Sequence, residues 1–189
     1  MNEINILENQ LKRMRSMNKL YHLQFLNDVR FYFAISIIAL IISFNNEKVL
    51  YLLPLIALLG SVILSFHAYF LIFSRNYSEY LEKKINKLSD TELFITHKLE
   101  YSYFFPIQDK KIVVAKIGKE FSWFSFVTLF ITFYGLFLYA YSVYEIVSTL
   151  ENINYLMFII VLTIITFSVG YWWFIKNVGE SRLRSIYDE

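Results

Sequence analysis

The sequence of 189 residues contains no cysteine, five glycines and two prolines, and only 18% of its residues are charged. Without cysteine the chain has no disulfide bonds, no thiolate metal site and no palmitoylation site at cysteine. Five glycines leave no glycine-rich phosphate loop, and neither a GxGxxG nor a P-loop pattern occurs. The composition also excludes disordered chains, which combine few apolar residues with many charges, and collagen-like chains.

Hydrophobic residues make up 57% of the chain, and aromatic residues alone make up 20%. Four long runs contain no charged residue: 31–46, 49–74, 121–144 and 152–175. A helix needs about 20 apolar residues to cross a bilayer, so three of these runs are long enough by themselves. The first run has 16 residues, and the long side chains of Arg30 and Lys48 extend it by reaching toward the headgroups. We therefore expect an all-α, polytopic membrane protein with four transmembrane helices. The alternative is one re-entrant or interfacial segment followed by three spans.

The basic residues indicate how these helices are oriented. Segments 1–30, 75–120 and 176–189 hold 17 of the 18 Lys and Arg residues. Because basic loops stay on the cytoplasmic side, both termini are predicted to be cytoplasmic. The two outer connections are short, so they join antiparallel neighbours into hairpins at 31–74 and 121–175.

The first thirty residues lack an apolar core, and we therefore expect no cleavable signal peptide. The chain is rich in Ile, Asn, Lys, Phe and Tyr, as is expected of an AT-rich bacterial genome. The predicted location is the bacterial inner membrane.

Small and polar residues recur at helical spacing along each run, which is typical of helix–helix contact in a membrane. They are Tyr32, Ser36, Ala39 and Ser43 in the first run; Pro54, Ala57, Ser61, Ser65 and Ala68 in the second; Ser125, Thr128, Thr132, Gly135, Tyr139 and Ser142 in the third; and Thr163, Thr166 and Gly170 in the fourth. A close-packed bundle accounts for these stripes. The alternative is a polar pore lined by several subunits, and the candidate packing or pore-lining residues are Ala57, Ser61, Ser65, Ser125, Thr128, Thr132, Gly135 and Ser142.

His67 is the only ionisable side chain other than tyrosine inside a charge-free run. Intramembrane ionisable residues are candidates for function, although a histidine this close to Arg75 also fits an ordinary structural role at the interface. The candidate gating or polar cluster is formed by Asp28, Arg30, His67 and Arg75, which would meet at the inner surface if the first hairpin packs. No Asp, Glu, Lys or Arg lies inside a run, which argues against a secondary transporter.

The three basic segments are predicted to form a cytoplasmic helical layer. Residues 1–30 favour a helix that continues into the first span, with Leu11, Met14, Tyr21 and Phe25 on one face. Residues 75–88 favour an amphipathic helix with Tyr77, Leu81, Ile85 and Leu88 on its apolar face. The capping-box pattern SDTE at 89–92 is expected to end that helix and start another, and residues 93–105 fit either a strand or a helix. The carboxylates Glu79, Glu82, Asp90, Glu92 and Glu100 alternate with lysines as on a solvated helix face.

No arrangement of residues points to catalysis. His22, His67 and His97 lack the HExxH, HxxxH or cysteine partners of a metal site. We therefore expect a non-enzymatic protein without cofactor or metal. Its expected partners are the lipid bilayer, further copies of itself and a cytosolic protein at residues 75–120, and we expect no nucleic acid.

The layout of residues 1–90 resembles the SLATT-type small membrane proteins of bacteria: a basic helix, a tight two-span hairpin and a cytoplasmic helix beginning NYSEYLEKKIN. The second hairpin, at 121–175, departs from that layout. The resemblance implies a pore-forming effector of nucleotide-signalled conflict and antiphage systems, and it carries no functional residue. The expected function is an oligomeric pore-forming or membrane-perturbing effector controlled through its cytoplasmic layer. The alternatives are a membrane scaffold or sensor that recruits a cytosolic partner, and a lipid-modifying enzyme or transporter subunit.

Overall fold

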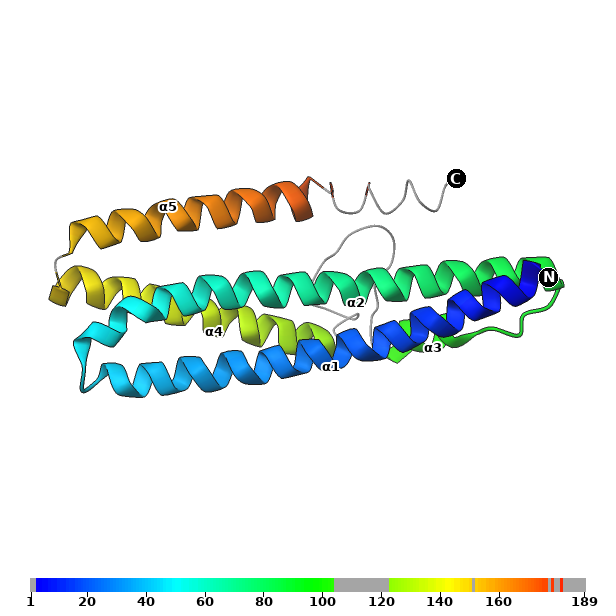
Figure 1. The fold of residues 1–189 in the computed structure, drawn as a ribbon, viewed down its shortest axis with the longest axis horizontal. Helices are drawn as coiled ribbons and strands as arrows, with labels where there is room; N and C mark the ends of the chain where they lie inside the picture. The colour runs from blue at the N-terminus through cyan, green and yellow to red at the C-terminus, as the bar shows by residue number, and fades with distance from the viewer. Residues whose placement is uncertain (1–2, 104–122, 151, 177, 179–180, 182–189) are drawn as a thin grey trace. The chain divides into compact units, whose positions relative to one another are not determined.

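The computed structural model describes residues 3–103, 123–150, 152–176, 178 and 181. Figure 1 shows its elements in chain order, coloured from blue to red. They are α1 (Glu3–Ser43), the 3-10 helix η1 (Glu47–Leu52), α2 (Leu53–Ser89), α3 (Thr96–Tyr103), α4 (Trp123–Glu145), the π-helix η2 (Ile146–Leu150), α5 (Ile153–Gly170) and the π-helix η3 (Tyr171–Ile175). Every element in the described part of the chain is helical, which confirms the predicted all-α fold class.

α1 is a single helix of 41 residues. Nothing in its sequence interrupts it, because neither glycine nor proline occurs between its ends. At about 1.5 Å per residue it measures about 60 Å, twice the thickness of the hydrocarbon core of a bilayer. The predicted continuous helix from the N-terminal segment into the first apolar run is confirmed.

The connection between α1 and α2 forms where the sequence places two asparagines. Asn45 and Asn46 follow the end of α1, and the side-chain oxygen of Asn46 accepts a hydrogen bond from the backbone N–H of Lys48 at 3.2 Å. This contact caps the start of η1. α2 then begins at Leu53 with Pro54 in its first turn, where the missing N–H of proline breaks no helical hydrogen bond.

Four helical stretches are long and apolar enough to cross a membrane, judged by length and composition. They are Glu3–Ser43, Glu47–Ser89, Phe126–Thr149 and Ile153–Trp173. Large hydrophobic side chains are exposed along them, among them Ile38, Ile41, Phe133, Leu136 and Phe167. Water makes such a surface unfavourable, whereas lipid tails cover it. The prediction of four helices of membrane-crossing length is confirmed.

The chain divides into two compact units. Unit 1 takes in Met1–Phe25, His67–Thr128 and Arg182–Glu189, and unit 2 takes in Leu26–Phe66 and Leu129–Ser181. Both α1 and α2 contribute residues to each unit.

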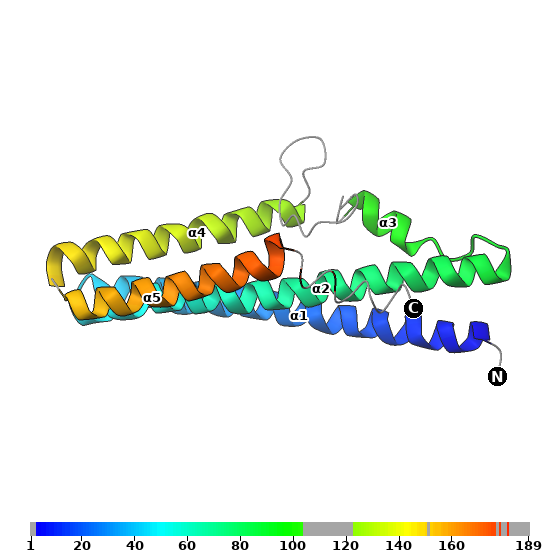
Figure 2. The same ribbon diagram turned by 90° about the horizontal axis from the view of Figure 1, so that it is seen from above.

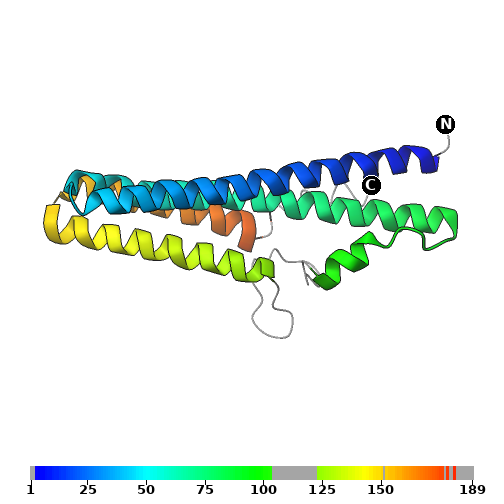
Figure 3. The ribbon, with the colours of Figure 1, turned by 90° about the horizontal axis from the view of Figure 1, so that it is seen from below.

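In unit 1 the first part of α1 packs against the last part of α2. The partners run in opposite directions along the two helices: Glu3 faces Lys84, Asn18 is hydrogen-bonded to Ser74, and the ring of Tyr21 lies against that of Phe70. The apolar core of the unit consists of Leu7, Leu11, Leu81 and Ile85. After α2 the chain runs back along the end of this helix before α3 begins, as Figure 2 and Figure 3 show from opposite sides.

Unit 2 combines large apolar residues with a close helix contact at a small residue. Its apolar core contains Ala39, Leu50, Leu53, Ala57, Leu138 and Ile146. The ring of Tyr32 on α1 lies directly on the backbone of Gly60 on α2, so closely that a methyl group on Gly60 would come within 2.3 Å of two ring carbons. Close approach of this kind is what small residues permit between membrane helices.

The segment after α2 differs from the prediction. α2 ends at Ser89, but the SDTE pattern does not start the next helix. Asp90 instead adopts a positive φ of 50°, and the backbone N–H of Thr91 donates to the carbonyl of Asn86 at 3.3 Å. These two features form a C-terminal cap of the Schellman type, which leads the chain away from the helix axis.

α3 begins only at Thr96. Of the two structures predicted for 93–105, the helix is observed from Thr96 to Tyr103, while Leu93 to Ile95 are irregular. Residues 104 and 105 lie outside the described residues.

Candidate functional site

Glu82 is the only buried carboxylate in the described parts of the chain, with 2% of its side chain exposed. It lies on α2 next to Leu81, a residue of the unit 1 core. The predicted solvated helix face was therefore wrong for Glu82. A buried carboxylate is stable only when it is paired and hydrogen-bonded, so the partners of Glu82 define the candidate site.

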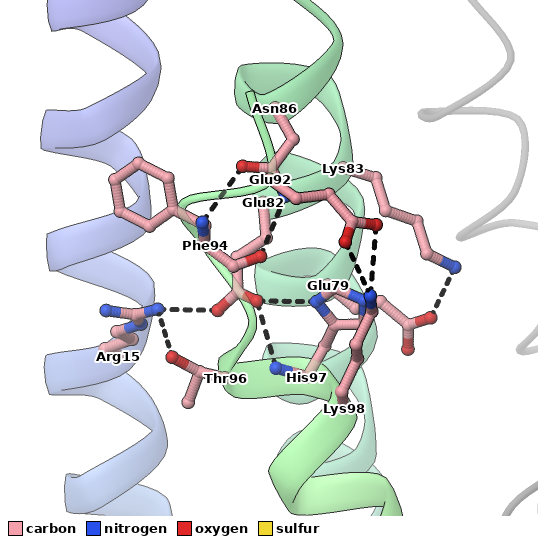
Figure 4. Close-up of polar contacts among 10 residues, drawn as sticks. All are labelled: Arg15, Glu79, Glu82, Lys83, Asn86, Glu92, Phe94, Thr96, His97 and Lys98. Carbon is pink, nitrogen blue, oxygen red and sulfur yellow. Dashed lines mark hydrogen bonds and ion pairs between the residues drawn. The ribbon is translucent and has the colours of Figure 1, made fainter. Parts of the chain in front are cut away.

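Arg15 on α1 supplies the first partner. Its Nη2 donates to Oε1 of Glu82 at 2.6 Å, and the same nitrogen donates to Oγ1 of Thr96 at 2.8 Å (Figure 4). The Arg15 side chain is 41% exposed, so it reaches the buried carboxylate from the surface of the helix pair. One guanidinium thus connects α1, α2 and the first residue of α3.

His97 supplies two further hydrogen bonds to the other carboxylate oxygen. Oε2 of Glu82 accepts from the backbone N–H of His97 at 3.0 Å and lies 2.7 Å from Nδ1 of its ring. Because His97 is the second residue of α3, its N–H has no partner within that helix. Glu82 therefore caps α3 from a different helix, with its negative charge at the positive end of the α3 dipole.

Asn86, one turn after Glu82 on α2, holds the backbone just before α3. Its amide nitrogen donates to the carbonyl of Phe94 at 2.8 Å, and its amide oxygen accepts from the N–H of Phe94 at 3.0 Å. This two-point contact satisfies both backbone groups of an irregular residue. The ring of Phe94 packs against the unit 1 core, and the guanidinium carbon of Arg15 lies 6.0 Å from its centre.

The surroundings of Glu82 keep its carboxyl group ionised. Burial raises the pKa of the group and is the largest single effect. The hydrogen bonds from Arg15, from the backbone of His97 and from the His97 ring, with the charge of Arg15, together outweigh burial and lower the pKa below its ordinary value of 4.5. Since a carboxylate only accepts hydrogen bonds, Nδ1 of His97 carries the hydrogen that it shares with Oε2.

Two neighbouring ion pairs in Figure 4 have a different character. Lys83 contacts Glu79 at 2.6 Å on the outside of α2, and Lys98 contacts Glu92 at 3.0 Å. These pairs are exposed to water, where an ion pair contributes little to stability. The cluster of Arg15, buried Glu82 and His97 instead joins α1 and α2 to the start of α3.

The polar stripe residues of unit 2 contact other helices of the same chain. The hydroxyls of Ser36 and Tyr134 lie 2.8 Å apart, and the Tyr139 and Thr163 hydroxyls lie 2.7 Å apart. The hydroxyl of Tyr155 is hydrogen-bonded to the carbonyl of Tyr51. Such contacts favour the close-packed bundle as the explanation of these stripes.

The candidate packing or pore-lining residues differ in how far they are buried. Ala57, Thr128, Gly135 and Ser142 are buried, Ser61, Ser65 and Thr132 are exposed, and the side chain of Ser125 lies outside the described residues. The hydroxyls of Ser61 and Ser142 donate to carbonyls of their own helices, at 2.7 and 2.9 Å, which satisfies them without water. Only the exposed members are placed to meet a neighbouring subunit, and pore lining stays a prediction.

The candidate gating cluster is distributed over both units. Asp28, half-buried, and Arg30, exposed, belong to unit 2, whereas His67, half-buried, and Arg75, buried, belong to unit 1. Their convergence stays a prediction. Among the described residues no three His, Asp or Glu side chains are grouped as a metal site would require.

Sequence reasoning missed the cluster around Glu82. Arg15 and Glu82 are 67 positions apart, and Glu82 and His97 are 15 apart, so no local motif joins them. The available signal was weak: Glu82 lies beside Leu81 and three residues before Ile85, at the edge of the apolar face. Comparison of the chain with protein-family models, with curated proteins and with solved structures gave no match.

Proposed function

We propose that this chain is a bacterial inner-membrane protein that acts as an oligomeric pore-forming or membrane-perturbing effector controlled through its cytoplasmic layer. In this proposal the four apolar helices form two antiparallel hairpins, 31–74 and 121–175, with both termini in the cytoplasm. The distribution of basic residues supports the orientation. The SLATT-type layout of residues 1–90 supports the class of effector.

The observation that carries the proposed control is the cluster of Arg15 and His97 around the buried Glu82 carboxylate. α1 and α2 each extend beyond their charge-free runs, and the cluster ties these extensions to α3. α3 belongs to the stretch that leads to the next apolar helix, α4. A change in this contact therefore acts on segments that are covalently continuous with three of the proposed spans.

An exposed polar side chain on an apolar helix supports association with further copies. Ser65 on α2 is exposed among large exposed hydrophobic residues such as Val62 and Phe66. Lipid tails offer no hydrogen bonds, whereas a neighbouring helix or a water path offers them.

A membrane-potential assay in a bacterium tests the proposal. Expression of the chain together with its neighbouring genes is expected to depolarise the cells, as reported by a potential-sensitive dye, and Ser65→Leu is expected to weaken the effect by removing an exposed hydroxyl. Val62→Leu is the matched control, since it changes an exposed apolar residue of the same helix. Intact potential at every expression level and with every co-expressed neighbouring gene would contradict the proposal.

A second candidate is a non-conducting scaffold that recruits a cytosolic protein to residues 75–120. Leu88, Leu93, Ile95 and Leu99 favour it, because they are 45%, 75%, 44% and 57% exposed in a region without a membrane-length apolar run. Large apolar side chains that are exposed outside the bilayer are candidates for binding a partner. Affinity purification distinguishes the two: a scaffold brings down a stoichiometric partner that Leu93→Glu releases, whereas a homomeric pore requires none.

A third class, a lipid-modifying enzyme or transporter subunit, depends on Asp28, Arg30, His67 and Arg75. His67→Ala tests it, because unchanged activity in every assay removes the main reason for considering it.

A further inference from the structure

The described contacts that dock the start of α3 come from Phe94, Thr96 and His97 and are mostly polar. Residues 90 to 93 are exposed, and Lys98 and Leu99 on α3 are exposed as well. The segment is attached through the Asn86 contact to Phe94, the Phe94 ring, and the hydrogen bonds of Arg15 and Glu82 to Thr96 and His97. Within unit 1, the described side chains of 94–99 are thus joined to α1 and α2 by one aromatic ring and a set of directional polar bonds.

Such a contact fixes one docked position, and little free energy is needed to separate the two surfaces. A charged pair loses hydration on burial, and this loss offsets much of its attraction, so the pair recovers favourable hydration when it separates into water. Separating two apolar surfaces of the same area has no such compensation, because each Å² of apolar surface exposed to water costs about 25 cal/mol. The geometry therefore suits an element that docks in one position and leaves it again.

The pair formed by α1 and α2 does not depend on α3. Leu7, Leu11, Leu81 and Ile85 pack between the two helices, and the contacts of Asn18 with Ser74 and of Tyr21 with Phe70 lie further along the same pair. None of these contacts involves a residue of α3. Release of α3 would leave them in place.

We infer that Arg15, Glu82 and His97 form a latch that holds α3 on the α1–α2 pair, and that opening the latch releases the segment 94–99 while α1 and α2 stay folded. The docked state is the resting state of unit 1. The connection from latch opening to membrane activity rests on the function proposed above, whereas the docking itself does not.

Hydrogen exchange followed by mass spectrometry tests the latch on the full chain in lipid nanodiscs. In Glu82→Gln the carboxylate charge is lost, and exchange in peptides covering 94–99 is expected to become about ten- to a hundredfold faster, because a hydrogen bond to a charged group is worth roughly that factor. Glu79→Gln is the matched control: it is the same substitution one turn earlier on α2, in an exposed pair with Lys83. The control is expected to exchange like the parent chain.

Two results would overturn the latch. One is unchanged exchange of 94–99 in Glu82→Gln. The other is faster exchange throughout 3–25 and 67–89, which would make Glu82 a general structural residue of the helix pair. His97→Phe provides a second, milder variant, because it removes the ring donor and keeps the backbone N–H. It is expected to accelerate exchange of 94–99 by a smaller factor than Glu82→Gln does. No acceleration would also count against the latch.

Measuring membrane potential with the same variants separates the two proposals. Faster exchange of 94–99 in Glu82→Gln without any depolarisation of cells supports the latch and contradicts the proposed effector function. Depolarisation by Glu82→Gln with unchanged exchange overturns the latch and keeps the effector function.

Discussion

Replacing Gly60 with alanine tests the close contact between α1 and α2 in unit 2. The added Cβ would lie 2.3 Å from Cδ2 and Cε2 of Tyr32, whereas carbon atoms pack favourably at about 3.5 to 4.0 Å. The ring must therefore move by about 1 Å. It has little room, because Tyr32 is 4% exposed and its ring contacts Phe33 and Tyr134.

The size of the effect follows from two opposing contributions. Overpacking a well-filled interior by a methyl group costs about 1 to 3 kcal/mol. Alanine has a higher helix propensity than glycine, so the same substitution stabilises the helix by about 1 kcal/mol. Gly170→Ala isolates the second contribution, because a Cβ at Gly170 meets nothing within 4 Å. The two variants are thus expected to differ by about 1 to 3 kcal/mol, with Gly60→Ala the less stable.

Thermal unfolding in detergent micelles, followed by circular dichroism, measures the difference. For a chain of this length 1 kcal/mol corresponds to about 2 to 4 °C in melting temperature, so a gap of several degrees between the variants is expected. Adding Tyr32→Leu to Gly60→Ala should reduce the difference in melting temperature from Gly170→Ala, because leucine replaces the ring that the added methyl group contacts. Equal melting temperatures of Gly60→Ala and Gly170→Ala would refute the inferred contact.

Three further predictions follow from burial, hydrogen bonding and charge. Leu81→Ala is expected to lower the free energy of unfolding by about 2 to 5 kcal/mol, because the side chain is 1% exposed. Leu88→Ala, at a side chain that is 45% exposed, should lower it much less, and denaturant titration measures both values. A double-mutant cycle with Ser36→Ala and Tyr134→Phe is expected to give a coupling of about 0.6 kcal/mol, typical of a hydrogen bond between membrane helices, and zero coupling would exclude a contribution from this bond. The pKa of Glu82 is lowered, so its contribution to docking is fully present above the ordinary carboxyl pKa and is lost as the pH falls through the folded value. Exchange of 94–99, corrected for intrinsic rates, should accordingly rise as the pH falls below the ordinary carboxyl value of 4.5, and a constant value there would contradict this assignment.

The four apolar helices were predictable because they depend on local composition. A run such as 152–175 has no charged residue, and every backbone group in a helix bonds within the same segment, so the sequence alone specifies both the helix and its suitability for lipid. The inner faces of α1 and α2 were also predictable in part. Leu11 and Ser36 on α1 and Leu81 and Ile85 on α2 are buried as their spacing indicates. Periodicity is a local property, and it needs no knowledge of the partner helix.

The end of α2 and the start of α3 were only half predictable. The stop at Ser89 has a local signal, but the position of Thr96 as the first residue of α3 depends on Glu82, Asn86 and Arg15, which reach it from other helices. These tertiary contacts, and not the local capping pattern at 89–92, place the start of α3 at Thr96.

By itself the sequence determined the four long apolar helices, their apolar surfaces and the faces on which small residues lie, because each of these depends on residues a few positions apart. Only the tertiary structure decided that Glu82 is buried and not solvated, and that His97 and Arg15 are its partners. The physical reason is that a carboxylate at the edge of an apolar face is stable either in water or in a closed set of hydrogen bonds. The donors that select the second state come from positions 67 and 15 residues away in the chain, where no local pattern indicates them.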